Sequence, residues 1–201
     1  MYHINHIQDG LSKDDLWDKP AWVTINEIDE SGQAKLIEDA QKVIRANKNF
    51  LPIVIDSYGG EVYSALGMYD IIRSFDCEVL TVVIGKAMSA GALLFSAGDY
   101  RYISENSTIM IHQVSSVAYG KEEELRQEAE EVTRLNDHLF GMLDKRCKKK
   151  KGYWKKLLKD NEYTDLYLTG KDAVDHGLAS EIGLPNIRAE AQDVRRTWIK
   201  E

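Results

Sequence analysis

The sequence predicts an α/β domain, because short apolar strands alternate with amphipathic helices along most of its 201 residues. Two β-branched runs, at 53–55 and 79–84, are typical of buried strands. Between them, at 62–72, apolar residues recur at the three- and four-residue spacing of a helix. No internal repeat, low-complexity tract or linker interrupts this alternation, so we expect one domain with a sizeable core.

The elements follow in order from the apolar spacing and from the residue types that begin and end helices. Residues 1–20 show no clear periodicity and are expected to form an arm that ends at Pro20. Ser31 is a residue type that caps helices, and Thr169 followed by Asp172 has the spacing of a capping box. The expected strands are 21–28, 53–55, 79–84, 101–104, 108–112 and 165–168, and the expected helices are 31–47, 62–72, 90–97, 121–147, 153–158 and 170–176.

The longest expected helix covers about Lys121 to Cys147 and would measure about 40 Å at ~1.5 Å per residue. An apolar stripe runs along it from Leu125 to Leu143, and its first turn is strongly acidic. A helix of this length is expected to project from a small domain.

Composition and charge exclude several classes of protein. The net charge of −7 argues against a general nucleic-acid binder, since phosphate contacts need a basic surface. No apolar run approaches roughly 20 residues, so we expect no membrane span, and the N-terminus lacks the apolar core of a secretory signal. The two cysteines, Cys77 and Cys147, form neither a disulfide framework nor a metal-ligand spacing, which favours a reducing, cytoplasmic location.

Ser89 stands at a junction between an apolar strand and a helix that is apolar on all sides, 90–97. The first free N–H groups of that helix, and the positive end of its dipole, would stabilise a negative oxygen beside the Ser89 hydroxyl. A lone serine at this position is more often an N-cap. A catalytic role for Ser89 therefore depends on partners elsewhere in the chain.

A serine hydroxyl becomes a useful nucleophile when a base takes its proton and an acid orients the base. Three histidines are candidate bases: His138 lies inside the long helix, His176 ends a short helix, and His112 ends the strand 108–112. Of the three, His112 is held on a rigid element near a sheet edge. Asp165 begins a short strand and is by itself equally a turn acid, while Gly59-Gly60 allows positive φ and close approach of the backbone.

In these local contexts the order Gly-Gly, Ser, His, Asp resembles that of the proteolytic subunit of the Clp protease (ClpP) family. The motifs that carry the resemblance are Ser57-Tyr58-Gly59-Gly60, Gly85-Lys86-Ala87-Met88-Ser89-Ala90-Gly91-Ala92, Met110-Ile111-His112-Gln113, and Asp165-Leu166-Tyr167-Leu168-Thr169 with Ala173-Val174-Asp175-His176-Gly177-Leu178. The resemblance covers roughly 21–184 and implies a ClpP-like serine peptidase domain there, followed by a C-terminal tail at 185–201. It implies the ClpP/crotonase-like fold of repeated β-β-α units, with a projecting handle helix at about 121–147.

The resemblance also implies the roles of individual residues. Ser89 would be the nucleophile, His112 the general base and then acid, and Asp165 the group that orients His112. The oxyanion hole would consist of the backbone N–H groups of Gly60 and Ala90. The expected activity is that of a serine endopeptidase, which cleaves unfolded polypeptides or peptides through an acyl-enzyme and needs neither a cofactor nor a metal.

For substrate and partners, the resemblance implies β-addition and a ring. An extended substrate would pair with 114–120, so Val114, Ser115 and Ser116 are the expected substrate-binding residues. The handle helix would stack two heptameric rings of a homo-oligomer around the active sites. An AAA+ unfoldase is the partner that the family implies. This chain has no phosphate-binding Gly-x-x-x-x-Gly-Lys-[Ser/Thr] loop for ATP hydrolysis of its own.

The sequence departs from the family pattern at Tyr58 and at Val114, each of which stands where the family usually has proline. A divergent member, such as one that a phage encodes, fits these changes. Three alternatives stay open: a capsid-maturation protease of the same fold, a crotonase-like acyl-CoA enzyme, and a non-catalytic ring subunit. A complete Ser-His-Asp set argues against the last two, because neither needs one.

Overall fold

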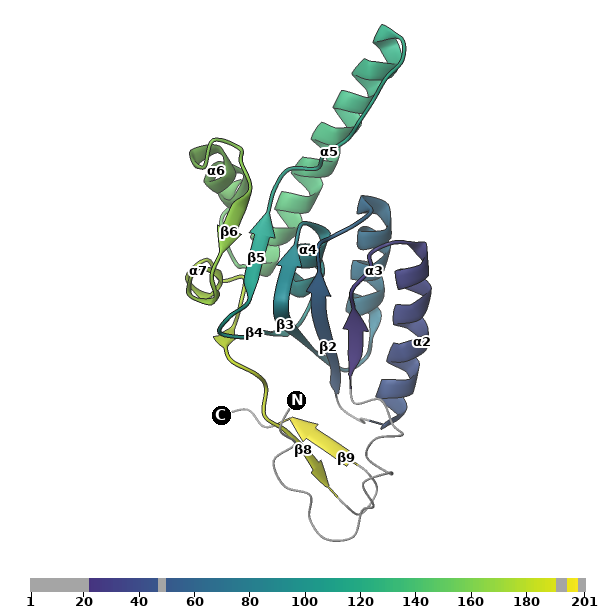
Figure 1. The fold of residues 1–201 in the computed structure, drawn as a ribbon, viewed down its shortest axis with the longest axis vertical. Helices are drawn as coiled ribbons and strands as arrows, with labels where there is room; N and C mark the ends of the chain where they lie inside the picture. Colours follow the sequence, from purple (N-terminus) through teal and green to yellow (C-terminus); the bar gives the residue numbers. More distant parts are fainter. Residues whose placement is uncertain (1–21, 47–49, 191–194, 199–201) are drawn as a thin grey trace.

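A seven-stranded sheet forms the centre of the protein in the computed structural model, which describes residues 22–46, 50–190 and 195–198 (Figure 1). The main path of the sheet is β1-β2-β3-β4-β7, and β5 pairs with β3 and with β6. Its strands are Val23–Ile25 (β1), Phe50–Ser57 (β2), Glu78–Met88 (β3), Tyr100–Ile103 (β4), Thr108–Ile111 (β5), Leu166–Leu168 (β6) and Glu181–Ile182 (β7). The helices are Glu30–Ala46 (α2), Val62–Ser74 (α3), Ala90–Ser96 (α4), Glu122–Arg146 (α5), Tyr153–Asp160 (α6) and Gly170–Asp175 (α7). The α/β class expected from the sequence is confirmed.

The core of the sheet is the parallel pair β2 and β3, whose residues are mostly buried. Successive residues are buried at 50–53 and at 79–83, so both faces are covered there, which explains why the sequence has continuous apolar runs instead of alternation. A bulge interrupts the β2–β3 register between Ile55 and Ser57. The bulge lies at the carboxyl end of β2, immediately before the Gly59-Gly60 turn, and so it affects how that turn approaches β3.

The start of α2 differs from the expectation that Ser31 is its cap. The helix begins at Glu30, and Oδ1 of the preceding Asp29 accepts hydrogen bonds from the Gly32 N–H and from the Ser31 hydroxyl, both at 2.7 Å. The prediction for Ser31 was wrong because the carboxylate of Asp29 is the stronger acceptor for the free N–H groups of the first turn. These hydrogen bonds, that from Gly32 first, lower the pKa of Asp29.

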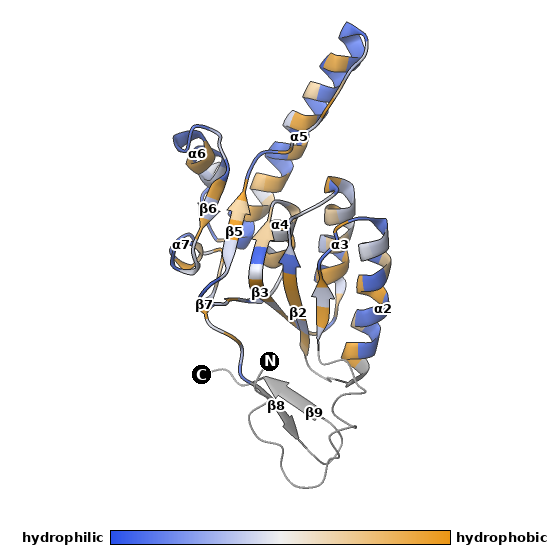
Figure 2. Cartoon of the chain, in the orientation of Figure 1, coloured by the Kyte–Doolittle hydropathy of each residue, from blue (hydrophilic) through white to orange (hydrophobic). Residues whose placement is uncertain are grey.

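Only the carboxyl-terminal half of α5 packs against the domain, while its amino-terminal half projects away from it (Figure 1). Leu135, Phe140 and Leu143 are buried in the packed half. Figure 2 shows apolar residues among polar ones along the projecting half. Leu125 lies in this half and is 41% exposed. The helix, with 25 residues, is about 38 Å long at ~1.5 Å per residue.

Two further features complete the described chain. Within the expected tail, Ile187–Glu190 (β8) and Arg195–Trp198 (β9) pair as an antiparallel two-stranded sheet at the end of the molecule opposite the tip of α5 (Figure 1). The expected arm at 1–20 lies outside the described residues. Within the ranges that the structure describes, no helix combines the length and the apolarity of a membrane span.

Three arginines converge on the carboxyl end of α4. Arg146 donates to the carbonyl oxygens of Ser96, Ala97 and Gly98, at 2.8, 3.2 and 2.6 Å. Arg73 donates to that of Ala97, and Arg101 to that of Gly98. The last carbonyl oxygens of a helix receive no hydrogen bond from within it, so they need donors from elsewhere. Positive charge at this end also interacts favourably with the helix dipole. The arginines therefore fix the buried helix that begins next to Ser89.

Replacement of Arg146 by methionine is expected to lower the free energy of unfolding by about 2 kcal/mol, because it removes charge-assisted hydrogen bonds to the carbonyls of 96–98. Methionine keeps most of the apolar stem, so lost packing contributes little. Urea unfolding at one fixed protein concentration measures the change. Arg126→Met is the matched control, since Arg126 bonds only to Glu123 and Glu130 of its own helix and is exposed. An equal loss in both variants would contradict the role of Arg146 at α4.

Candidate active site

Ser89 follows β3 directly and precedes the first residue of α4. Its backbone has φ 53° and ψ −119°, a conformation that residues other than glycine rarely adopt. Hydrogen bonds hold it there: its N–H donates to the Met110 carbonyl at 2.8 Å, and its carbonyl accepts from the Ala92 N–H at 3.0 Å. The side chain makes no capping hydrogen bond to α4. Ser89 therefore occupies the N-cap position of α4, as its residue type allows, but its hydroxyl does not cap the helix and is directed elsewhere.

The Ser89 hydroxyl meets the imidazole of His112: Oγ lies 2.7 Å from Nε2. The register of the sheet brings the two residues together. β3 and β5 are parallel neighbours in which Met88 pairs with Met110, so both chains leave the sheet at nearly the same level. Ser89 and His112 therefore come from the carboxyl ends of adjacent parallel strands, the usual place for a site in an α/β sheet.

Asp165 lies on the other side of the imidazole. Its Oδ1 is 3.8 Å from Nδ1 of His112, within ion-pair range and too long for a hydrogen bond, and its side chain is 50% exposed. The antiparallel pairing of β5 with β6, in which Ile111 pairs with Leu166, places Asp165 there. The other two candidate bases lie outside this group: His138 is exposed on α5, and Nδ1 of His176 is 2.6 Å from the Tyr153 hydroxyl.

The Gly59-Gly60 turn passes against Ser89 so closely that side chains are excluded. Gly59 has φ +106°, and a Cβ built there would lie 2.8 Å from Cβ of Ser89. A Cβ at Gly60 would lie 2.1 Å from the carbonyl oxygen of Ile28, with which Gly60 forms an isolated parallel bridge. Ala90 opens α4, and the first N–H groups of a helix have no acceptor inside it. The turn and the helix start thus both border the space beside the Ser89 hydroxyl.

A polar cluster that the sequence analysis missed supports this turn. Nζ of Lys86 lies 2.7 Å from Oδ1 of Asp56 and 4.2 Å from the centroid of the Tyr58 ring. The hydrogen bond to Asp56 raises the pKa of Lys86. Ser57 also holds the turn, since its hydroxyl donates to the Asn26 carbonyl at 2.6 Å and accepts from the Gly59 N–H at 3.2 Å. The available signal was an acid that ends one strand and a lysine near the end of the next.

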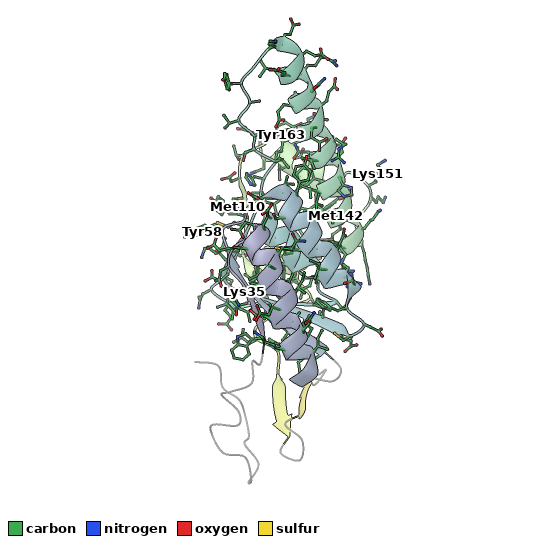
Figure 3. All side chains as sticks on the ribbon, turned by 90° about the vertical axis from the view of Figure 1, so that its right-hand side faces the viewer. Lys35, Tyr58, Met110, Met142, Lys151 and Tyr163 are labelled. Atoms are coloured by element: carbon green, nitrogen blue, oxygen red, sulfur yellow. The ribbon has the colours of Figure 1, made fainter. Side chains whose placement is uncertain are left out.

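A cavity of about 400 Å³ opens beside Ser89 and His112. Part of its lining is apolar and comes from α3, α4 and α5; these residues are Val62, Ala65, Leu93, Leu139, Phe140 and Leu143. Tyr58 and Met110 also line it, and Figure 3 places both at the same edge of the molecule. An apolar cavity next to a serine hydroxyl can hold an apolar group of a ligand.

The segment expected to bind substrate borders this cavity only in part. Val114 and Ser115 line it, whereas Ser116 is exposed and its hydroxyl bonds to the Glu128 carboxylate on α5. The Val114 N–H donates to Oδ1 of Asn136 at 2.9 Å, so it is already engaged. No three His, Cys, Asp or Glu side chains among the residues that the structure describes gather as metal ligands would.

Comparison with known proteins adds independent findings. A family model described as Clp protease matches residues 21–185. The chain is 35% identical over 147 residues to the ATP-dependent Clp protease proteolytic subunit 1 of Chlamydia felis, a match that covers 72% of this chain and 67% of the relative. It is 35% identical over 137 residues to the proteolytic subunit 2 of Chlamydia abortus, a match that covers 67% of this chain and 65% of the relative. It is 36% identical over 134 residues to the proteolytic subunit of Deinococcus radiodurans, a match that covers 66% of this chain and 64% of the relative. The matches thus span about two thirds of the length of these relatives, and slightly less for the last two.

Proposed function

The chain belongs to the Clp protease family of serine endopeptidases, and we propose that it cleaves peptide bonds with Ser89, His112 and Asp165 as its catalytic triad. The observation that carries this proposal is the 2.7 Å contact between the Ser89 hydroxyl and Nε2 of His112. A nucleophile within hydrogen-bond distance of a base, on rigid strand ends, is the arrangement that acyl transfer requires.

In the proposed reaction, Oγ of Ser89 attacks the carbonyl carbon of the scissile bond while Nε2 of His112 takes the hydroxyl proton. The C–N bond then breaks, and His112 returns that proton to the leaving amine. Water attacks the resulting ester, again with His112 as base, and releases the acid and the free Ser89 hydroxyl. Asp165 beside Nδ1 keeps the proton on that nitrogen, so Nε2 is free to accept.

We further propose that the N–H groups of Gly60 and Ala90 stabilise the oxyanion that forms during attack. Support comes from the close approach of the turn to Ser89, which only glycine permits at 59, and from the position of Ala90 in the first turn of α4. The ion pair and cation–π contact of Lys86 hold the same turn in place. Preorganised donors of this kind act without rearrangement at the moment of reaction.

The proposed substrates are unfolded polypeptides or peptides. The apolar cavity beside Ser89 suits one apolar side chain, and the segment that begins at Val114 and Ser115 offers backbone groups for β-addition. β-Addition requires an extended chain, which a folded substrate does not present. The sequence stretch 114–118 lacks glycine and is therefore stiffer than a glycine-rich strand would be.

For the assembly, we propose a homo-oligomer of two stacked heptameric rings, joined through the projecting half of α5. Three features support an intersubunit role for this end of the molecule: the exposed Leu125 on α5, and the fully exposed Val117 and Tyr119 in the segment beside it. The relatives are named as ATP-dependent subunits, so a Clp-type AAA+ unfoldase is the proposed partner. The free thiols of Cys77 and Cys147 suit the reducing cytoplasm that we propose as location.

Labelling with a fluorophosphonate tests the proposed activity directly, because such probes phosphonylate activated serines. Purified protein is expected to label at one site, which peptide mass spectrometry assigns to Ser89. Ser74→Ala is the control, since Ser74 is exposed at the far end of α3 and bonds only to the Ile71 carbonyl; it should label like the wild type. Absence of labelling in an assembled oligomer would contradict the proposed triad.

Replacement of Asp165 by asparagine is expected to lower kcat/KM for peptide hydrolysis by about 100-fold, since the amide no longer favours a proton on Nδ1 of His112. The long contact and the exposure of Asp165 make this loss smaller than in a tightly buried triad. Steady-state kinetics on a fluorogenic peptide measure it. Asp160→Asn, a change of another carboxylate near the end of α6, is the control and should retain wild-type kinetics. Wild-type activity in Asp165→Asn would remove Asp165 from the mechanism.

A further inference from the structure

Asn136 is a buried polar residue in the middle of α5, and its side chain is only 8% exposed. Both ends of its amide are engaged. Oδ1 accepts the hydrogen bond from the Val114 N–H at 2.9 Å, and Nδ2 donates to the carbonyl of Val132, one turn earlier in the helix, at 2.9 Å. Polar side chains are rarely buried without a specific hydrogen-bonding role. Asn136 also lines the cavity beside Ser89, so its role lies next to the proposed chemistry.

The hydrogen bonds of Asn136 and Glu128 attach the segment expected to bind substrate, 114–120, to α5. Val114 and Ser116 are two residues apart, and their partners Asn136 and Glu128 are eight residues apart on the helix. Eight helical residues rise about 12 Å, whereas two residues of chain span at most about 7 Å. The segment must therefore run nearly extended along α5, as its trace beside the helix shows (Figure 1).

In an extended chain, the backbone N–H and C=O groups of successive residues point to opposite edges. Because the Val114 N–H faces Asn136, the polar groups of Ser115 face the other way. Ser115 lines the cavity, and no described residue accepts a hydrogen bond from its N–H. Ser115 thus has backbone groups available for a substrate strand, and Val114 has already used its donor.

We propose that Asn136 is a positioning residue, which sets the register of substrate binding by holding the Val114 N–H so that Ser115 pairs with the substrate backbone. This inference rests on the proposed peptidase function. The described hydrogen bonds of the Asn136 side chain join α5 to the segment after β5 and to Val132, and none of them goes to Ser89 or His112. Its loss should therefore weaken the binding of an extended peptide far more than it slows the chemical step.

The test uses an internally quenched ten-residue peptide, taken from a casein cleavage site of the wild-type enzyme. Asn136→Leu is similar in size but lacks the acceptor. It is expected to raise KM about tenfold, which corresponds to a loss of about 1.4 kcal/mol in the free energy of peptide binding, and to change kcat less than about threefold. Asn136→Asp keeps an acceptor for the Val114 N–H, so its KM should lie much closer to the wild-type value than that of Asn136→Leu. Asp137→Asn, an exposed change next to it, is the matched control and should match the wild type.

A double-mutant cycle isolates the contact. Proline has no N–H, so Val114→Pro removes the same hydrogen bond from the other side. In that background Asn136→Leu should change KM less than about twofold, because the two substitutions remove one interaction. A wild-type KM in Asn136→Leu would overturn the proposal. A fall in kcat as large as the rise in KM would also overturn it, because it would indicate a general structural role. If the wild-type protein itself failed to label with fluorophosphonate, this would instead contradict the proposed peptidase function.

Discussion

Replacement of Ser89 by alanine is expected to lower kcat/KM for peptide hydrolysis by about 10⁴-fold or more, since no other group replaces the attacking oxygen. The hydroxyl is 2.7 Å from Nε2 of His112 and has no role as a helix cap, so its removal leaves the fold intact. Residual activity would come from the oxyanion donors and from substrate binding alone. Steady-state kinetics on a quenched peptide and fluorophosphonate labelling both measure the loss.

The free energy of unfolding of variants at Ser89 gives a second readout. Ser89 has φ 53° and ψ −119°, a strained conformation that alanine shares and that glycine adopts more readily. Ser89→Gly should therefore be inactive and yet more stable than Ser89→Ala by about 1 kcal/mol in urea unfolding. Equal stability of the two variants would show that the backbone at Ser89 is not strained. Turnover close to the wild-type rate in either variant would exclude Ser89 as the nucleophile.

Replacement of Gly60 by alanine is expected to lower kcat by about 100-fold or more, the size of effect that follows removal of one oxyanion donor. A Cβ at this position would lie 2.1 Å from the carbonyl oxygen of Ile28, which belongs to the backbone and cannot turn aside. The turn must therefore move away from Ser89, and its N–H moves with it. Because the bridge between Gly60 and Ile28 is lost, the free energy of unfolding should fall as well.

Gly141→Ala is the matched control, because it makes the same chemical change where the added Cβ meets nothing within 4 Å apart from its chain neighbours and the nearby backbone of its own helix. Gly141 lies inside α5, so alanine there should stabilise the protein by about 0.5–1 kcal/mol and leave kcat unchanged. Kinetics and urea unfolding are measured on both variants at one protein concentration. Wild-type kcat in Gly60→Ala would show that the Gly60 N–H takes no part in catalysis.

The order and type of the main elements were predictable from the sequence because they depend on local patterns. The apolar run at 79–84 lies inside the observed β3, and His112 directly follows β5. The long helix, expected at 121–147, is observed as Glu122–Arg146. A short run of β-branched residues was sufficient for the strands, and an apolar spacing of 3.6 residues was sufficient for the long helix.

Contacts between distant segments were not predictable in this way. The ion pair of Lys86 with Asp56 depends on the parallel register of β2 and β3, which the spacing of apolar residues does not specify. The hydrogen bond from Val114 to Asn136 depends on how the segment after β5 lies along α5. The choice of Asp29 over Ser31 as cap is decided by competition between two acceptable residues within one turn. The positions of Ser89, His112 and Asp165 came from a family resemblance, and their distances came only from the structure.

The antiparallel pairing of β6 with β5 has a consequence for the order in which a newly made chain becomes reactive. During synthesis, Ser89 and His112 emerge long before Asp165, which arrives with β6 near the end of the domain. Pairing of β6 with β5 closes a long loop, and contacts of this kind form late because their entropic cost must be met first. A nascent chain therefore lacks the third member of the proposed triad until the domain is almost complete. The order of residues along the chain would thus delay completion of the proposed triad until the domain that holds it has folded.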